Sequence, residues 1–162
     1  MEKLLTSEVT IRFQDCDPFN HLNNARYLDY FINAREDQII AAYQLDVFKL
    51  AATKGKSWVI SSNQIAYFRP AQVMEKVSIE TRLIDFTEKR LLVEMQMWDK
   101  DQSDMKALLW AGFTHFDLKN LIPISQLSEF GELFGQVVSP VAEKTFEKRV
   151  KNVERKKIED SV

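Results

Sequence analysis

The sequence predicts an α+β fold in which an antiparallel sheet wraps around one long, buried helix. Two observations carry this prediction. A helical pattern over residues 24–43 is apolar on most of its circumference in its first half, which is typical of a helix buried on most sides. Four strand patterns then follow one another through mostly polar connections, as in an antiparallel meander. A sheet folded around the helix is the simplest packing that buries both.

The first strand pattern covers residues 8–14, where apolar and polar residues alternate. A loop follows, because Pro18 lacks an amide donor and stops regular structure. We expect the long helix to be capped by Asn23 or Asn24, since an Asn side chain can accept a hydrogen bond from a free amide of the first turn. The helix then runs through about Tyr43.

The four later strand patterns differ in the burial that they predict. The patterns over 77–83 and 91–98 alternate and indicate one buried face each. The pattern over 58–68 is mixed, whereas that over 107–116 is apolar on both faces and indicates a central strand. The predicted order is a strand, the long helix and a four-stranded meander, with no second helix among the strands.

The texture of the sequence changes after residue 118. Residues 127–137 have the spacing of one short amphipathic helix, and the tail beyond Pro140 is dense in mixed charge. For this tail we expect a solvated or partly frayed helix. The predicted organisation is a single domain, with a core over residues 1–118 and a helical, charge-rich extension over residues 119–162.

Composition excludes several classes of protein. The 162 residues carry a formal net charge of −2, so no basic field attracts nucleic acid. No apolar run is long enough for a signal peptide or a bilayer span. The lone cysteine, Cys16, cannot form an internal disulfide. We expect a cytoplasmic protein that binds neither nucleic acid nor membrane.

Polar groups concentrate in residues 15–24, directly before the long helix. A calcium loop that began at Asp15 would need Gly and an acid where Asn20 and Arg26 stand, so an EF-hand is excluded. Two His and one Cys are too few for an ordinary zinc site. We expect no metal and no cofactor, and we interpret Cys16 as a packing residue rather than a nucleophile.

Asp17 and His21 admit two interpretations. An Asp in such a loop commonly caps a turn and needs no catalytic role. The same position also suits hydrolysis of an activated acyl group. The free amides at a helix start can polarise a carbonyl oxygen, and a nearby carboxylate can act as base or nucleophile. The residues alone leave both interpretations open.

Two segments carry a resemblance to a known family. The run Ile11-Arg12-Phe13-Gln14-Asp15-Cys16-Asp17-Pro18, with His21-Leu22-Asn23-Asn24-Ala25-Arg26-Tyr27-Leu28, resembles the hotdog-fold thioesterases of the 4-hydroxybenzoyl-CoA and acyl-CoA thioesterase group. The later Ile65-Ala66-Tyr67-Phe68-Arg69-Pro70-Ala71 is similar to a strand and turn of that family. The resemblance covers about residues 7–118 and implies the hotdog fold.

The resemblance also implies roles for individual residues. Asp17 matches the catalytic aspartate, and His21 and Asn23 match a His-x-Asn-Asn element beside the thioester. Asn24 and Tyr27 would act mostly through their amides at the helix start. The sequence departs from the family at Asn20, where Gly is common; Asn also tolerates the left-handed backbone region.

Residues beyond the loop are assigned more loosely. We expect Ser61 and Asn63, with Trp58, to line the substrate pocket, and Arg69 to meet the phosphates of CoA. His115 shares a strand face with apolar residues, so we expect it to be buried and hydrogen-bonded.

The predicted function is hydrolysis of an acyl-CoA, or of an acyl-carrier-protein thioester, to the free acid and the thiol. Two alternatives remain: an acyl-thioester dehydratase or hydratase, and a non-catalytic acyl-CoA-binding or scaffold protein. Similar proteins are homodimers joined edge to edge, with active sites at the interface, or homotetramers. We therefore expect a homodimer or homotetramer, which would also cover exposed sheet edges.

Overall fold

One antiparallel sheet and four α-helices make up the part of the chain that the computed structural model describes, residues 1–160 without the side chains of residues 157 and 158. In chain order the elements are β1 (Leu5–Thr10), α1 (Tyr27–Tyr43), α2 (Val47–Lys54), β2 (Lys56–Tyr67), β3 (Lys76–Phe86), β4 (Arg90–Asp99), β5 (Met105–Asp117), β6 (Ile122–Pro123), α3 (Leu127–Val137) and α4 (Phe146–Asp160). The strands lie in the order β1-β3-β4-β5-β2, with the short β6 beside β5. The α+β prediction is confirmed, and so is the place of β5 between two neighbours. The predicted four-stranded meander is wrong: of its four strands only β3, β4 and β5 are consecutive neighbours, because β2 pairs with β5 and β1 takes the place beside β3.

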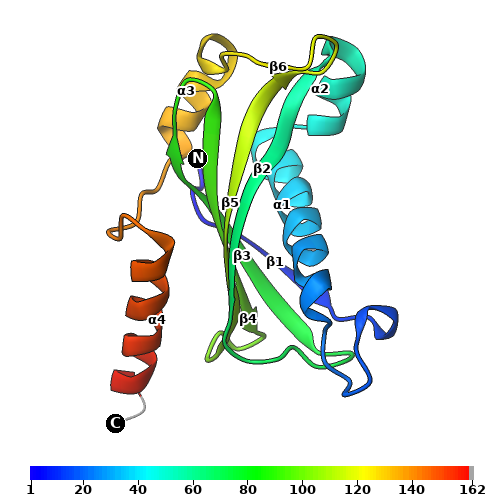
Figure 1. The fold of residues 1–162 in the computed structure, drawn as a ribbon, viewed down its shortest axis with the longest axis vertical. Coiled ribbons are helices and arrows are strands. Elements are labelled where there is room, and N and C mark those ends of the chain that lie inside the picture. The colour runs from blue at the N-terminus through cyan, green and yellow to red at the C-terminus, as the bar shows by residue number, and fades with distance from the viewer. Residues whose placement is uncertain (161–162) are drawn as a thin grey trace.

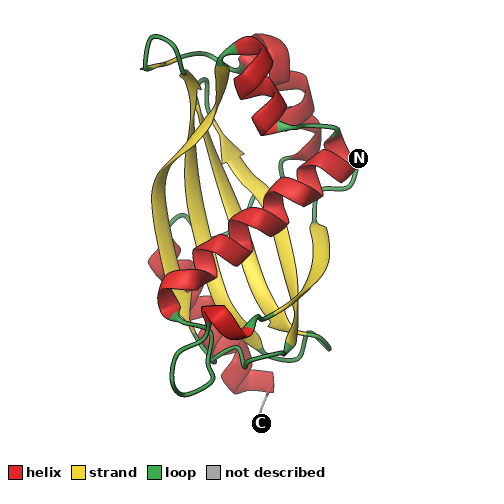
Figure 2. Cartoon of the chain, turned by 90° about the vertical axis from the view of Figure 1, so that its right-hand side faces the viewer, coloured by secondary structure: helices red, strands yellow, loops and turns green. Residues whose placement is uncertain are grey.

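The long helix α1 crosses the concave face of the sheet, which we call the inner face (Figure 2). Its first half is buried around Tyr27, Tyr30 and Phe31, and these side chains join one core cluster with inner-facing residues of the strands. The sheet thus wraps around the helix because α1 offers it apolar side chains over most of its length. Helix α3 packs into the same cluster through Phe134.

The start of α1 follows the predicted capping. Asn23 accepts a hydrogen bond from the Ala25 amide through its side-chain oxygen (3.0 Å), and a 3₁₀ turn over Asn24–Arg26 leads into the helix. The helix ends at Gln44, whose left-handed backbone (φ 56°) directs its amide back to the last turn. The predicted helix is therefore confirmed, with a 3₁₀ first turn.

Two elements at the N-terminal side differ from the sequence prediction. The strand expected over residues 8–14 lies at Leu5–Thr10 instead, and Phe13–Asp15 form a 3₁₀ turn in which Phe13 is exposed. The alternation of apolar and polar residues thus continues beyond Thr10, where the pairing of the strand ends. Helix α2 was not predicted, because its eight residues are too few to show a period; its signals are the capping Asp46 and the left-handed Gly55.

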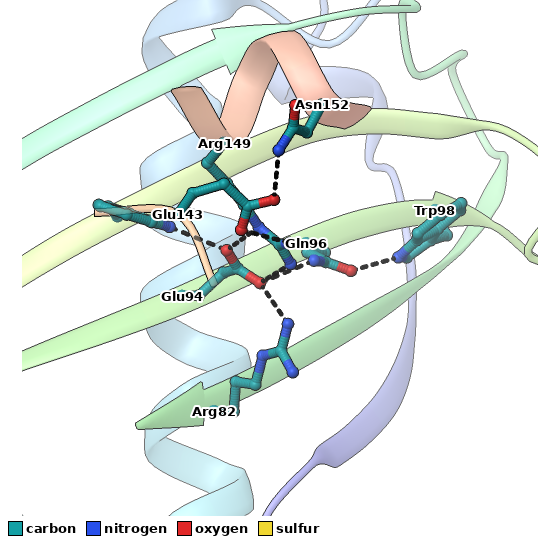
Figure 3. Close-up of polar contacts among 8 residues, drawn as sticks. Arg82, Glu94, Gln96, Trp98, Glu143, Arg149 and Asn152 are labelled. Atoms are coloured by element: carbon teal, nitrogen blue, oxygen red, sulfur yellow. Dashed lines mark hydrogen bonds and ion pairs between the residues drawn. The ribbon is translucent and has the colours of Figure 1, made fainter. Parts of the chain in front are cut away.

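The predicted C-terminal helix is confirmed, and most of its described residues are exposed, but the helix is docked on the sheet rather than merely solvated. Helix α4 lies on the outer face of the sheet, opposite α1 (Figure 1), where the rings of Phe146 and Trp110 are 5.7 Å apart. Its Arg149 forms two hydrogen bonds of 2.8 Å to Glu94 of β4, which is 1% exposed. Arg82 and Trp110 also donate to this carboxylate (Figure 3). A buried charge pair fixes the helix because either charge alone would be costly to bury.

Candidate active site

The loop before α1 is held in place from both sides. The Tyr30 hydroxyl donates to Asp15 (2.6 Å) and accepts from the Arg12 amide (2.9 Å), so α1 holds the incoming chain. Burial, together with the bond to Asp15, raises the pKa of Tyr30 to about 12. On the other side Leu22 donates to the carbonyl of Ala71, which anchors the loop to the turn before β3. The loop geometry is therefore determined by the core.

Asp17 uses one carboxylate oxygen to shape this loop. Its Oδ1 accepts the backbone amides of Phe19 (2.9 Å) and His21 (3.1 Å), and its own amide donates to the His21 carbonyl (2.8 Å). The Oδ2 atom accepts no hydrogen bond from any residue in the described part of the chain. Both interpretations of Asp17 are thus geometrically compatible: it caps a turn, and it also presents an oxygen for chemistry.

The helix start lies directly after this loop. The Asn23 side chain accepts the Ala25 amide, and the Asn24 amide has no acceptor among residues 1–160. The Asn24 carbonyl accepts from the Tyr67 hydroxyl (2.9 Å), which ties the end of β2 to the helix start. His21 is half-buried, four residues after Asp17 in the chain. The structure thus brings Asp17, His21, Asn23 and Asn24 into one short segment.

The remaining predicted site residues are more dispersed. Tyr27 is 2% exposed, and its hydroxyl accepts from the Ala71 amide (3.1 Å), so its side chain belongs to the core. Asn63 is exposed on the open edge of β2, opposite inner-facing Ala111. Ser61, at a bulge of the same strand, contacts the Gly112 carbonyl (3.2 Å) and Thr114.

Arg69 lies just after β2 and forms an ion pair with Asp104 of the neighbouring turn (3.2 Å). Both side chains are largely exposed, and Arg69 lines a groove between the outer face and α4. Its chain neighbours Tyr67 and Ala71 contact the helix start, through Asn24 and Tyr27, whereas the ion pair of Arg69 is formed with Asp104. Its expected contact with CoA stays a prediction.

His115 is buried and hydrogen-bonded as predicted. Its side chain is 1% exposed, and Nδ1 lies 3.2 Å from the carbonyl oxygens of Ile124 and Ser125. Burial lowers the pKa of His115, which favours the neutral ring. Its ring lies against Trp58 (4.8 Å between centroids). This histidine therefore belongs to the packing around α3.

A large apolar cavity lies between the second half of α1, the inner face of the sheet and α3. Its volume is about 360 Å³, and its walls include Ile39 of α1, Trp58 and Ile60 of β2, and Phe134 and Val137 of α3. None of the predicted catalytic or helix-start residues lines it. Within one chain, the Asp17 loop and the cavity are separate, because the loop lies before the first turn of α1.

Of the residues expected to line a pocket, Trp58 is part of this wall, whereas Ser61 and Asn63 are not. The sequence did not reveal the cavity as a whole, since its walls come from both α1 and α3, from α2 and from several strands of the sheet. Tyr67 was also missed, although the run Ile65 to Phe68 was noted as a motif. The signal for Tyr67 was its place near the end of a strand beside an Arg-Pro turn, where a tyrosine hydroxyl can reach a neighbouring backbone.

Comparison with known proteins identifies the class of this chain. The family model described as the thioesterase-like superfamily matches residues 11–143. The chain therefore belongs to this superfamily and is a thioester hydrolase by class. The match includes the Asp17 loop, α1, strands β2 to β6 and α3, and it ends before α4.

Individual relatives agree with this class. The long-chain acyl-CoA thioesterase FadM of Escherichia coli K12 is 24% identical over 134 residues, which are 83% of this chain and 99% of FadM. The structure of the Synechocystis 1,4-dihydroxy-2-naphthoyl-CoA thioesterase Slr0204 is similar with a TM-score of 0.74 at 12% identity, over 85% of this chain and 99% of that one. SAV2348 of Staphylococcus aureus, solved in complex with CoA, gives a TM-score of 0.75 at 13% identity, over 88% of this chain and 91% of that one. These likenesses confirm the hotdog fold.

None of the helices formed by residues 1–160 is long and apolar enough to cross a bilayer.

Proposed function

We propose that this chain hydrolyses acyl-CoA thioesters to the free acid and CoA, with Asp17 as the group that activates the attack. The observation that carries the proposal is the position of Asp17: Oδ1 is fixed by two backbone amides, while Oδ2 accepts no hydrogen bond from the described residues, immediately before a helix start. The carboxylate either removes a proton from water or attacks the carbonyl carbon itself. In the first case the hydroxide attacks the carbonyl, the C–S bond breaks, and the proton taken from water goes to the leaving sulfur, so that CoA leaves as the thiol. In the second case the C–S bond breaks to leave a mixed anhydride with Asp17, the sulfur takes a proton from solvent, and water then hydrolyses the anhydride to the free acid and Asp17.

The helix start supplies the complementary charge. The Asn24 amide has no acceptor within the described residues, and a helix N-terminus carries partial positive charge. A thioester carbonyl placed there would be polarised, and the oxyanion that forms on attack would be stabilised. We assign His21 and Asn23 to the same site, His21 beside the thioester and Asn23 as the residue that shapes the helix start.

A second copy of the chain would complete this site. Strand β2 is an edge strand of twelve residues, and its middle, Ile60–Gln64, is exposed. Antiparallel pairing of two β2 strands about their midpoint would place the Tyr67 end of one copy beside the Trp58 end of the other. The Asp17 loop of one copy would then meet the apolar cavity of its partner. We propose such a homodimer; the homotetramer and the cytoplasmic location expected from the sequence stay predictions.

The test is thiol release from a panel of acyl-CoAs by the wild type, Asp17→Asn and Asp101→Asn. The carboxamide that Asp17→Asn introduces keeps the oxygen that the Phe19 and His21 amides need, so the loop should fold normally. We expect Asp17→Asn to lose about 10²- to 10⁴-fold in rate, the usual contribution of a positioned acid or base. Asp101 is exposed in the turn before β5, and its substitution should change nothing.

The outcomes separate the alternatives. Thiol release by the wild type that is lost only in Asp17→Asn supports the proposal. Binding of acyl-CoA without thiol release by any variant would instead favour a binding or scaffold protein. Equal rates in wild type and Asp17→Asn would remove Asp17 from the chemistry.

A further inference from the structure

The apolar cavity has an open side and a closed side. At the open side Ile60 of the β2 edge is 45% exposed, and Glu36 of α1 is half-buried. The opposite walls are sealed, with Leu83 and Val137 each 2% exposed and Phe134 3% exposed. A ligand would therefore enter from the β2 edge, the side where the proposed homodimer places Asp17 of the second copy, and would end beneath α3.

The size and polarity of the cavity indicate the kind of ligand. Its volume is about 360 Å³ and its lining is largely apolar. A methylene group takes up about as much space as a water molecule, about 30 Å³, so the cavity holds a chain of about ten to twelve carbons. The charged end of Arg35 is directed to β3, where it donates to Thr81 (2.9 Å), and Glu36 at the open side would repel an anionic tail.

The closed wall is firmly held. The ring of Phe134 lies 6.0 Å from that of Trp58 and 5.8 Å from that of Phe86, measured between centroids. Trp58 is itself fixed by a hydrogen bond to the buried Gln126 (2.7 Å). After α3 the chain is tied back to the sheet, since the Ser139 amide donates to the Leu83 carbonyl (2.8 Å). Because this wall is closely packed, its displacement by a longer ligand would cost packing free energy.

From these observations we propose that the acyl group is an uncharged aliphatic chain of medium length, and that Phe134 and Val137 of α3 set its maximum length by closing the cavity. This inference rests on the proposed function, because it assigns the cavity to the acyl part of the thioester. It makes α3, which lies beyond the core expected from the sequence, the element that determines specificity.

The experiment measures kcat/KM for saturated acyl-CoAs of increasing length. For the wild type we expect a rise of up to about fourfold per added methylene, the fold-change of about 0.8 kcal/mol, until the cavity is full at about ten to twelve carbons, and a fall beyond. Phe134→Ala should move the optimum to chains longer by about three carbons, and the milder Phe134→Leu by about one. Val137→Phe should move it to shorter chains.

The matched control is Phe130→Leu. Phe130 lies on the same helix and contacts the same Trp58 ring (4.9 Å), but it is not part of the cavity wall. Its substitution should leave the optimum unchanged. An optimum that stays fixed in Phe134→Leu and Val137→Phe, while the wild type hydrolyses the thioesters, would overturn the inference alone. No hydrolysis at any chain length by the wild type would instead overturn the proposed function.

Discussion

Glu94 is a negatively charged residue in the interior, where burial alone would raise the pKa of its carboxyl group. The hydrogen bonds from Arg149, Trp110 and Arg82 outweigh burial and hold the pKa of Glu94 below its usual value. A pKa lowered by folding means that the ionised carboxylate stabilises the folded state. This contribution is present above the ordinary carboxyl pKa and is lost as the pH falls through the lowered value.

Glu94→Gln should therefore destabilise the protein in a pH-dependent way. At pH 7 we expect a loss of about 3 kcal/mol, because two guanidinium groups lose their counter-charge. As the pH falls below 4.5, where Glu94 of the wild type begins to be protonated in the unfolded chain, the difference should shrink. Urea unfolding at several pH values measures it. Exposed Glu132→Gln is the control; parallel stability curves for wild type and Glu94→Gln would contradict the argument.

At the scale of elements, α4 is a chain segment that the matched family model does not reach. It docks through its first half, where Arg149 binds Glu94 and also Glu143 (3.2 Å). The outer position Trp110 of β5 is buried, and its ring lies 5.7 Å from that of Phe146 in this half. This explains why β5 is apolar on both faces: α1 covers one face and α4 helps to cover the other.

Arg149→Met should release this helix. Hydrogen bonds to charged groups contribute about 1.5–3 kcal/mol each, so amide exchange in α4 should accelerate by at least about tenfold. Hydrogen exchange with peptide-level detection provides the measurement. Arg155→Met, an exposed position on the same helix, should leave exchange as it is. Unchanged exchange in Arg149→Met would mean that apolar contacts alone hold α4.

The periodic spacing of apolar residues predicted those elements in which one face of the element is buried. The cores of β3, β4 and β5 and the bounds of α3 were predicted closely, because a period of two or 3.6 residues reflects one buried face. The docking of α4 was not predicted, since nothing in the sequence tells that Arg149 meets Glu94, 55 residues earlier in the chain. The same holds for the candidate site. Asp17 and the helix start were predicted because they belong to a local sequence motif, whereas the cavity was not predicted because it depends on tertiary packing.

At the scale of the whole molecule, the two halves of the proposed site lie apart in one chain. The Asp17 loop precedes α1, and the part of α1 that lines the cavity begins only at Ile32. A homodimer with paired β2 strands contains two such sites, each with Asp17 from one copy and the cavity from the other. An isolated chain should then bind the acyl group in its cavity, but with the thioester too far from its own Asp17 for hydrolysis.

Mixing two defective variants tests this central claim most directly. Asp17→Asn lacks the reactive carboxylate, and Val137→Phe has a shortened cavity, so each alone should hydrolyse dodecanoyl-CoA slowly. When the subunits of an equal mixture exchange freely, about half of the dimers contain one copy of each variant, and one of the two sites in such a dimer is intact. The mixture should therefore recover about a quarter of the wild-type rate of thiol release. If the mixture is no faster than the average of the two variants, while the wild type is active, then Asp17 and the cavity do not meet across a dimer.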